Sequence, residues 1–363
     1  PGLFLCAQKG LLMMKLGSLV FNLQKPIPSM ASVEGWKEVP IVECGEPLVA
    51  LGSFSEYPDI VTDSIYVGER ISSPYPVAGI DGSLMTVFVR AGIAKRLRAA
   101  SRLLPDRHML LVWDAYRPLT VQRSLFEYFV NVLVERGSTK EQAVIDAQRF
   151  VSIPSEDPTR PPPHSTGAAV DLTIIRFEDR PWREMKKLTT LVRMKETPRN
   201  WKAIYEAEMR RQQLVRFSTV APMGTTFDQV LEQTATRYFE EARSLGDCGM
   251  VARNYRRMLF NVMRMAGFSN YDEEWWHYQC KNQFHAKITG EPALYGRAVF
   301  SDDNRRHENV RQRHYQGSIR IVERSHPQQQ GKVPTNELFP FVAAVATKTG
   351  HLRHTTHPSA AAI

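Results

Sequence analysis

The sequence predicts an α+β fold, in which a small mixed or antiparallel sheet is flanked by helices. Short apolar runs typical of strands and longer amphipathic runs typical of helices both occur, but they do not alternate as regular βαβ units do. Of the 363 residues, 43% are hydrophobic and 10% are aromatic, which is sufficient for a sizeable core. We find no internal repeat in the sequence.

Strands are predicted where short apolar segments occur. Residues 109–113 and 171–175 have the continuous apolar character of buried strands. Further strands are predicted at residues 39–44, 63–68 and 85–89.

Helices are predicted where apolar residues recur three and four positions apart. The first such helix ends at Pro105, and Gly137 and Gly267 are expected to end two later ones. Ser138 and Glu141 have the spacing of a capping box at a helix start. The predicted helices cover residues 93–104, 119–136, 139–151, 182–214 and 252–266.

The ends of the chain differ in character from its middle. The apolar run at residues 3–21 is interrupted by two lysines and is too short to span a membrane. We expect the natural start to lie nearer Met30. The expected organisation is a poorly structured leader at 1–35, a folded domain at 36–299, and a polar, disordered tail at 300–363.

The net charge of +9 does not follow the pattern of a nucleic-acid-binding surface. Much of the excess lies at residues 176–216 and 304–324, where basic and acidic side chains alternate, and no pattern of aromatics interleaved with a basic stripe marks a nucleic-acid module. We therefore expect solvated basic faces and no nucleic-acid partner. The four cysteines are widely spaced, which argues against a disulfide scaffold or a cysteine-based metal site and fits a cytosolic setting: Cys6, Cys44, Cys248 and Cys280.

A histidine and an aspartate lie close together after a proline-rich loop. In PPPHSTGAAVDLT, His164 follows three prolines, and the small residues after it let the backbone pass close to a neighbour. Asp171 then opens an apolar strand, where an isolated carboxylate would be costly to bury and a metal ion would remove that cost. The alternative is a turn in which Asp171 caps a neighbouring backbone.

A second segment, YDEEWWHYQC, holds a carboxylate and an imidazole three residues apart among aromatic side chains. Glu274 and His277 could present both groups to one pocket, from which the aromatics would exclude water. The alternative is an aromatic core segment with a hydrogen-bonded histidine. The spacing differs from the H-E-x-x-H helix of the zincins.

Together, the two segments contain the parts of a catalytic zinc site. Such a site has three protein ligands and an open position for water, and we predict His164, Asp171 and His277 as the ligands of one zinc ion per chain. Zinc lowers the pKa of its bound water to about 7, and a carboxylate can accept the proton as the water attacks a carbonyl. Glu274 is the predicted general base, and Glu273, which has a poorer spacing to His277, is its rival.

A lone arginine follows the buried strand predicted at 109–113. In WDAYRP, Arg117 would supply a fixed cation to the negative charge that develops on the carbonyl oxygen during amide hydrolysis. The alternative is a structural ion pair with Asp114 or another acid.

These motifs, in this order, resemble those of the D-alanyl-D-alanine dipeptidases. That family has W-D-x-Y-R-P, then S-x-H-x-x-G-x-A-x-D, then E-x-W-H, where this chain has WDAYRP, HSTGAAVD and EWWH. The resemblance covers about residues 60–298 and includes MGTTFD at 223–228. It implies zinc ligation by His164, Asp171 and His277, a base role for Glu274, and stabilisation of the tetrahedral intermediate by Arg117.

The resemblance also implies a small α+β catalytic domain around a single zinc site and a closed pocket limited to dipeptides. Two features depart from the family pattern. Pro162 stands where the family has a serine two residues before the first histidine, and Ser165 could replace it only if the loop is rearranged. A charged helical insert at about 176–220 lengthens the chain between the motifs, and could be a lid, an oligomer contact or decoration.

The predicted function is therefore that of a cytosolic zinc metallopeptidase, a hydrolase that cleaves free D-Ala-D-Ala or a similar cell-wall dipeptide. One alternative is a peptidoglycan D,D-carboxypeptidase or endopeptidase, which would require export, and no convincing export signal is seen. Another is a non-catalytic binding module that keeps the zinc fold. The presence of both Glu274 and Arg117 argues against this last reading, and the sequence leaves the oligomeric state open.

Overall fold

A computed structural model describes residues 22–325, apart from 68–74, 76–78, 149–150, 196, 198, 230 and 243, and describes side chains up to residue 313. Its strands are β1 (Leu48–Ala50), β2 (Val61–Thr62), β3 (Phe88–Arg90), β4 (His108–Asp114), β5 (Ala169–Arg176), β6 (Thr219–Val220), β7 (Ser269–Asn270) and β8 (His277–Gln279). The larger sheet has the order β2-β4-β5-β8-β7, and β6 pairs with β5 outside this path. Only the β2–β4 pairing among these strands is parallel, so the sheet is mixed, as predicted.

The two longest strands, β4 and β5, form the centre of the core. Every residue of β5 from Ala169 to Ile175 is buried, as is β4 from Met109 to Asp114. This burial on both faces explains why the two segments are continuously apolar rather than alternating. The predicted strands at 109–113 and 171–175 are therefore confirmed. β1 and β3 form a separate antiparallel pair.

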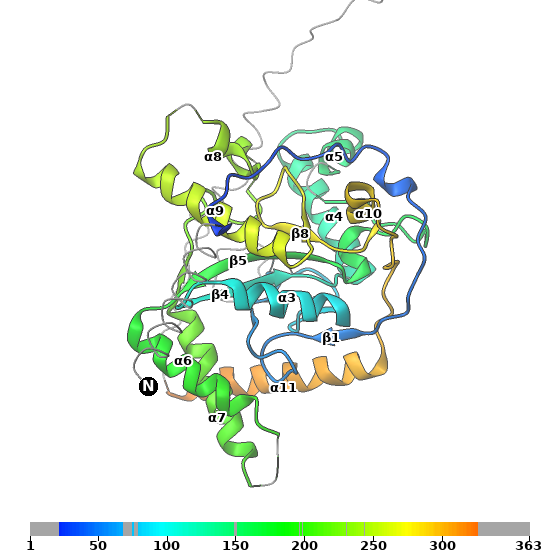
Figure 1. The fold of residues 1–363 in the computed structure, drawn as a ribbon. Helices are drawn as coiled ribbons and strands as arrows, with labels where there is room; N and C mark the ends of the chain where they lie inside the picture. Colours follow the sequence, from blue (N-terminus) through cyan, green and yellow to red (C-terminus); the bar gives the residue numbers. More distant parts are fainter. Residues whose placement is uncertain are drawn as a thin grey trace, which may run out of the picture.

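Helices cover both the sheet and its ends (Figure 1). They are α3 (Ala91–Leu103), α4 (Leu119–Glu135), α5 (Lys140–Ala147), α6 (Asp179–Val192), α7 (Trp201–Arg216), α8 (Tyr238–Glu241), α9 (Asp247–Met265), α10 (Gln283–Thr289) and α11 (Asp302–Ser325), with the short 3-10 helices η1 (Trp36–Glu38), η2 (Pro163–Thr166) and η3 (Glu232–Thr234). In space α3 packs with α9, α4 with α5 and α6 with α7, while α11 runs past β1. The α+β class predicted from the sequence is confirmed.

Two of the predicted strands are wrong. Residues 39–44 make one isolated bridge, Ile41 to Ala293. Val42 and Cys44 donate backbone hydrogen bonds to Ala293 and Leu294, but among the described residues this pairing does not extend into a strand. After Thr62 the regular ladder with β4 ends: Asp63 and Ile65 still donate backbone hydrogen bonds to the carbonyls of Val112 and Trp113, each at 3.0 Å, but residues 65–67 form a turn. The strand expected at 85–89 begins only at Phe88.

The helix predictions need smaller corrections. The cap of α5 is Thr139, whose hydroxyl accepts a hydrogen bond from the Gln142 backbone N–H at 3.2 Å, and not the predicted pair of Ser138 and Glu141. The charged helical sequence expected at about 182–214 forms two helices, α6 and α7. Gly267 follows α9 with a positive φ of 84°, as its predicted role in ending that helix requires.

The ends of the described chain are more ordered than expected. The expected disordered tail is wrong for Asp302–Ser325, which forms α11. This helix is tied to the fold because the Glu308 carboxylate accepts hydrogen bonds from the backbone N–H groups of Met85 and Thr86, at 2.8 and 2.9 Å. Leu23 is likewise buried in the core, within the segment expected to be a poorly structured leader. The remaining parts of both predicted ends, 1–21 and 326–363, lie outside the described residues.

Among the described residues, no helix is both long and apolar enough to cross a membrane. Cys44, Cys248 and Cys280 are free thiols, and Cys6 lies outside the described residues.

Candidate active site

The predicted metal ligands come together from three neighbouring elements. His164 lies in η2, Asp171 in β5 and His277 at the start of β8. The sheet register pairs Asp171 directly with His277 on one side and with Asp114 of β4 on the other. Gly167 turns the chain from η2 into β5 with a positive φ of 67°, and its carbonyl accepts a hydrogen bond from the Arg90 backbone N–H at 2.9 Å. The predicted close approach of this backbone to a neighbour is thus present.

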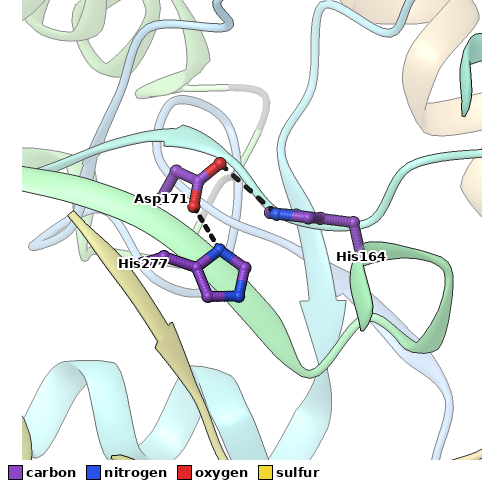
Figure 2. Close-up of side chains that lie close together, drawn as sticks. All are labelled: His164, Asp171 and His277. Carbon is purple, nitrogen blue, oxygen red and sulfur yellow. Dashed lines mark hydrogen bonds and ion pairs between the residues drawn. The ribbon is translucent and has the colours of Figure 1, made fainter. Parts of the chain in front are cut away.

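The Asp171 carboxylate lies between the two imidazoles (Figure 2). His164 Nε2 is 3.3 Å from Asp171 Oδ2, and His277 Nδ1 is 2.8 Å from Asp171 Oδ1. One potential ligand atom from each of the three residues lies within 4.8 Å of the others. All three residues are buried, with 4 to 7% of their surface exposed.

The protonation of these groups suits metal binding. His164 Nδ1 is 2.9 Å from the Ala115 carbonyl oxygen, which can only accept, so Nδ1 carries the proton and the Nε2 lone pair faces Asp171. Burial lowers the pKa of both histidines, which keeps the imidazoles neutral. Burial, and then the neighbouring Asp114, raise the pKa of Asp171 well above its ordinary value. Two neutral imidazoles, together with a carboxylate that a nearby cation would stabilise, form a donor set that fits a divalent metal ion such as zinc.

Glu274 faces the same site from the turn before β8. Its Oε2 is 3.8 Å from His277 Nδ1, and its side chain is 27% exposed, which leaves it accessible from the pocket. Trp275 and Trp276 are 2 and 3% exposed and fix this turn in the core, so the aromatic segment is core and also carries the site. Burial raises the pKa of the Glu274 carboxyl to about 8. The rival Glu273 is exposed and does not line the cavity.

Arg117 lines this cavity together with the three metal-binding candidates and Glu274. Its Nε and Nη2 donate to Asp114 Oδ2 at 3.0 and 2.6 Å, and its Nη1 donates to Gln122 Oε1 at 3.0 Å. The ion pair with Asp114, which the sequence left as an alternative, is therefore formed. It is compatible with a role in the site, because an arginine has five N–H donors and these contacts use three of them.

The cavity has a volume of about 160 Å³ and contains polar groups that the sequence analysis did not assign. Tyr66 donates its hydroxyl proton to Asp114 Oδ2 at 2.7 Å, which completes the support of Arg117. Asp228 accepts a hydrogen bond from the Tyr75 hydroxyl, and loss of solvation raises the pKa of Asp228. Asp114 lies in the motif WDAYRP, and Asp228 ends the motif MGTTFD. No residue spacing in the sequence indicated that these two acids face one pocket.

The two departures from the family pattern have a clear structural outcome. Ser165 is buried and donates its hydroxyl proton to the Arg117 carbonyl oxygen at 3.1 Å, so it does not take the place of a pocket serine at Pro162. Among the described residues that line the cavity, none comes from the insert at 176–220. The insert therefore does not cover this cavity as a lid in the structure described.

Comparisons with known proteins indicate the class of protein that this chain resembles. Residues 209–292, which include Glu274 and His277, match the sequence model of the peptidase M15 family, described as D-ala-D-ala dipeptidase. The chain is thereby identified as a hydrolase of the metallopeptidase class.

More particularly, the chain is similar to two D-alanyl-D-alanine dipeptidases. It is 25% identical over 267 residues to that of Synechocystis sp., covering 68% of this chain and 87% of the relative. It is 24% identical over 187 residues to that of Enterococcus faecium, covering 52% of this chain and 69% of the relative. The resemblance predicted from the motifs is confirmed.

Proposed function

We propose that this protein is a zinc-dependent dipeptidase that hydrolyses free D-Ala-D-Ala or a closely related dipeptide. The observation that carries the proposal is that His164, Asp171, His277, Glu274 and Arg117 all line one small cavity, although they come from separate parts of the chain. The names of the two relatives support the choice of substrate. The cytosolic location remains a prediction from the sequence.

His164, Asp171 and His277 would hold one zinc ion. When bound, zinc would polarise the scissile carbonyl and lower the pKa of a coordinated water to about 7. The hydrogen bond from His164 Nδ1 to the Ala115 carbonyl fixes the ring that offers Nε2. Asp171 would exchange its present contacts with the two rings for contacts with the cation.

Glu274 is the proposed general base and acid. Its pKa of about 8 refers to the site without a cation, and a nearby positive charge would favour the carboxylate that can accept a proton. The Glu274 carboxylate takes a proton from the attacking water and then delivers it to the nitrogen of the leaving amine. The neighbouring tryptophans limit the water that could compete for this proton.

Arg117 is proposed to stabilise the oxyanion of the tetrahedral intermediate. Asp114 and Gln122 fix its guanidinium in place, so its unused N–H donors need little reorganisation during the reaction. A cation fixed in this way is worth several kcal/mol, because it acts in a partly desolvated cavity.

Asp228 is proposed to select free dipeptides. A free dipeptide carries an ammonium group close to its scissile bond, and the Asp228 carboxylate lines the same cavity as Glu274. The Tyr75 hydroxyl holds this carboxylate in position. A longer peptide would place an uncharged amide there and leave the carboxylate unpaired, at a cost in affinity.

The test is hydrolysis of D-Ala-D-Ala, L-Ala-L-Ala and a pentapeptide ending in D-Ala-D-Ala, each with and without a chelator. The proposal predicts chelator-sensitive cleavage of D-Ala-D-Ala and little cleavage of the other two. Preferential cleavage of the pentapeptide would favour the carboxypeptidase alternative. Binding of D-Ala-D-Ala by the zinc-loaded protein without any turnover would favour the non-catalytic module.

A further inference from the structure

We propose that a second cavity, enclosed by β2, α7 and α11, is a binding site for a small anion that carries a carboxylate or phosphate group on a short apolar body. The structure describes fifteen residues that line this cavity, and none of these fifteen lines the candidate active site. The binding proposal does not depend on the catalytic function proposed above.

A buried ion pair forms one wall of this second cavity. Glu208 and Arg211 of α7 are each only 3% exposed, and Arg211 Nη1 donates to Glu208 Oε2 at 2.7 Å. The other Glu208 oxygen accepts a hydrogen bond from the Ser53 hydroxyl at 2.5 Å. The charge of Glu208 is therefore already balanced within the protein. Arg211 Nη2 donates to the Pro58 carbonyl, but its Nε is buried without a hydrogen-bond partner in the described structure.

Arg311 of α11 brings a second cation to the cavity. Its guanidinium carbon lies 5.8 Å from the centre of the Phe54 ring. Within the described part of the chain it makes no hydrogen bond or ion pair. Loss of solvation lowers the pKa of Arg311, although Glu208 and Glu308 lie close enough to oppose this shift. The Glu308 carboxylate already accepts hydrogen bonds from the backbone N–H groups of Met85 and Thr86, which precede β3.

The balance of charge around the cavity favours an anion. Arg211, Arg216 and Arg311 line it against Glu208 and Asp63, and Arg216 and Asp63 each have a partner of their own. A desolvated guanidinium that lacks an anion is unfavourable, and a carboxylate or phosphate matches its donors. Five of the other described lining residues are apolar, which is why we expect a short apolar body on the ligand: Ile60, Val61, Val67, Met85 and Val215.

The second cavity and the candidate active site lie on the two sides of one segment. Asp63, Ser64 and Val67 line the second cavity, while Ile65 and Tyr66 line the first. A ligand in the second cavity would therefore contact the turn that carries Tyr66, whose hydroxyl supports Asp114.

The test is calorimetric titration of the full-length, chelator-treated protein with butyrate and, separately, with inorganic phosphate at constant ionic strength. Wild-type protein should bind at least one probe saturably, and Arg311→Gln should weaken that binding by about tenfold or more, since it removes the charged donor. Binding of butyrate alone would identify a carboxylate ligand, and binding of phosphate alone a phosphate ligand. Arg305→Gln is the matched control, because Arg305 lies on the same helix, is 64% exposed and does not line the cavity.

The proposal is overturned if neither probe binds wild-type protein saturably, or if Arg311→Gln binds as tightly as wild type. Arg117→Gln separates the two cavities: loss of binding in that variant, with binding retained in Arg311→Gln, would place the anion in the candidate active site instead. The thermal unfolding temperature of each variant shows whether it is folded. Arg311 has no hydrogen-bonded partner to lose in the described structure, so its variant should unfold close to the wild-type temperature.

Discussion

Asp171 is the residue through which the parts of the candidate site meet. The strand register places it between Asp114 and His277, and its carboxylate contacts both imidazoles. Two carboxylates on adjacent strands of a buried sheet repel one another, which is why the pKa of Asp171 is raised by Asp114 in addition to burial. The positive charge of Arg117 offsets the negative charge of Asp114, and a bound cation would offset the negative charge of Asp171.

At the residue scale, Arg117→Lys should lower kcat by about 10²-fold and Arg117→Gln by up to about 10³-fold. A lysine keeps the charge, but its compact ammonium cannot contact Asp114 and Gln122 in the fork geometry that Arg117 uses. Steady-state kinetics on D-Ala-D-Ala, with zinc content measured alongside, gives the answer. Arg123→Gln is the control, since Arg123 is 52% exposed. Unchanged kcat in Arg117→Gln would exclude an oxyanion role.

The pH dependence of stability provides a second test at this scale. In the metal-free protein burial raises the pKa of Glu274 from 4.5 to about 8, so the folded state retains a proton that the unfolded chain releases above pH 4.5. The stability that this group contributes is therefore full below about pH 4.5 and is lost as the pH rises towards 8. The stability of wild type relative to Glu274→Gln should fall over this window in urea unfolding. A difference that is constant with pH would contradict the burial of this carboxyl.

At the scale of elements, the segment from η2 into β5 determines where His164 and Asp171 lie. It could be recognised from the sequence because prolines, small residues and an apolar strand follow one another within a few positions. The strands predicted at 39–44 and 63–68 show the limit of such local signals. Their local pattern suits a strand, but strand pairing depends on a distant partner. On that edge of β4 the regular ladder comprises Val61 and Thr62, after which Asp63 and Ile65 each donate a single backbone hydrogen bond to β4.

Gly167→Ala should destabilise the protein more than Gly290→Ala. Both glycines have a positive φ, 67° and 73°, so both variants lose about 1–2 kcal/mol from backbone strain. An added Cβ at Gly167 would also lie 2.5 Å from Leu48 Cδ2, whereas at Gly290 it would have no neighbour within 4 Å. Urea unfolding of both variants measures the difference, and zinc titration should show weaker binding only for Gly167→Ala. Equal losses of stability would contradict the close approach at Gly167.

At the scale of the whole molecule, the fold unites residues far apart in the sequence, and this limited what the sequence could predict. The metal-binding candidates and Glu274 were predictable because motifs carry them. Tyr66, Asp228 and the second cavity were not, because they depend on the docking of separate segments. Nor was the order of α11, whose polar sequence is tied down by single contacts such as Asn304 Nδ2 to the Leu48 carbonyl at 3.0 Å.

Metal binding should stabilise the whole fold. A ligand present at about 1,000 times its Kd adds about 4 kcal/mol to the free energy of unfolding, if it binds only the folded state. Chelation should therefore lower the Tm of wild type by several degrees, because the metal-binding residues join η2, β5 and β8. In Asp171→Asn the chelator should lower the Tm much less than in wild type, whereas in Glu274→Gln it should lower the Tm as much as in wild type. A chelator effect of wild-type size in Asp171→Asn would remove Asp171 from the site.

The central claim is tested most directly by comparing Glu274→Gln with Glu273→Gln, measuring D-Ala-D-Ala turnover and zinc content in the same preparations. Glu274 lines the cavity 3.8 Å from His277 Nδ1, whereas Glu273 is exposed to solvent outside it. We predict that Glu274→Gln loses at least about 10²-fold in kcat while keeping close to one zinc ion per chain, and that Glu273→Gln retains both. Full turnover by Glu274→Gln would contradict the account.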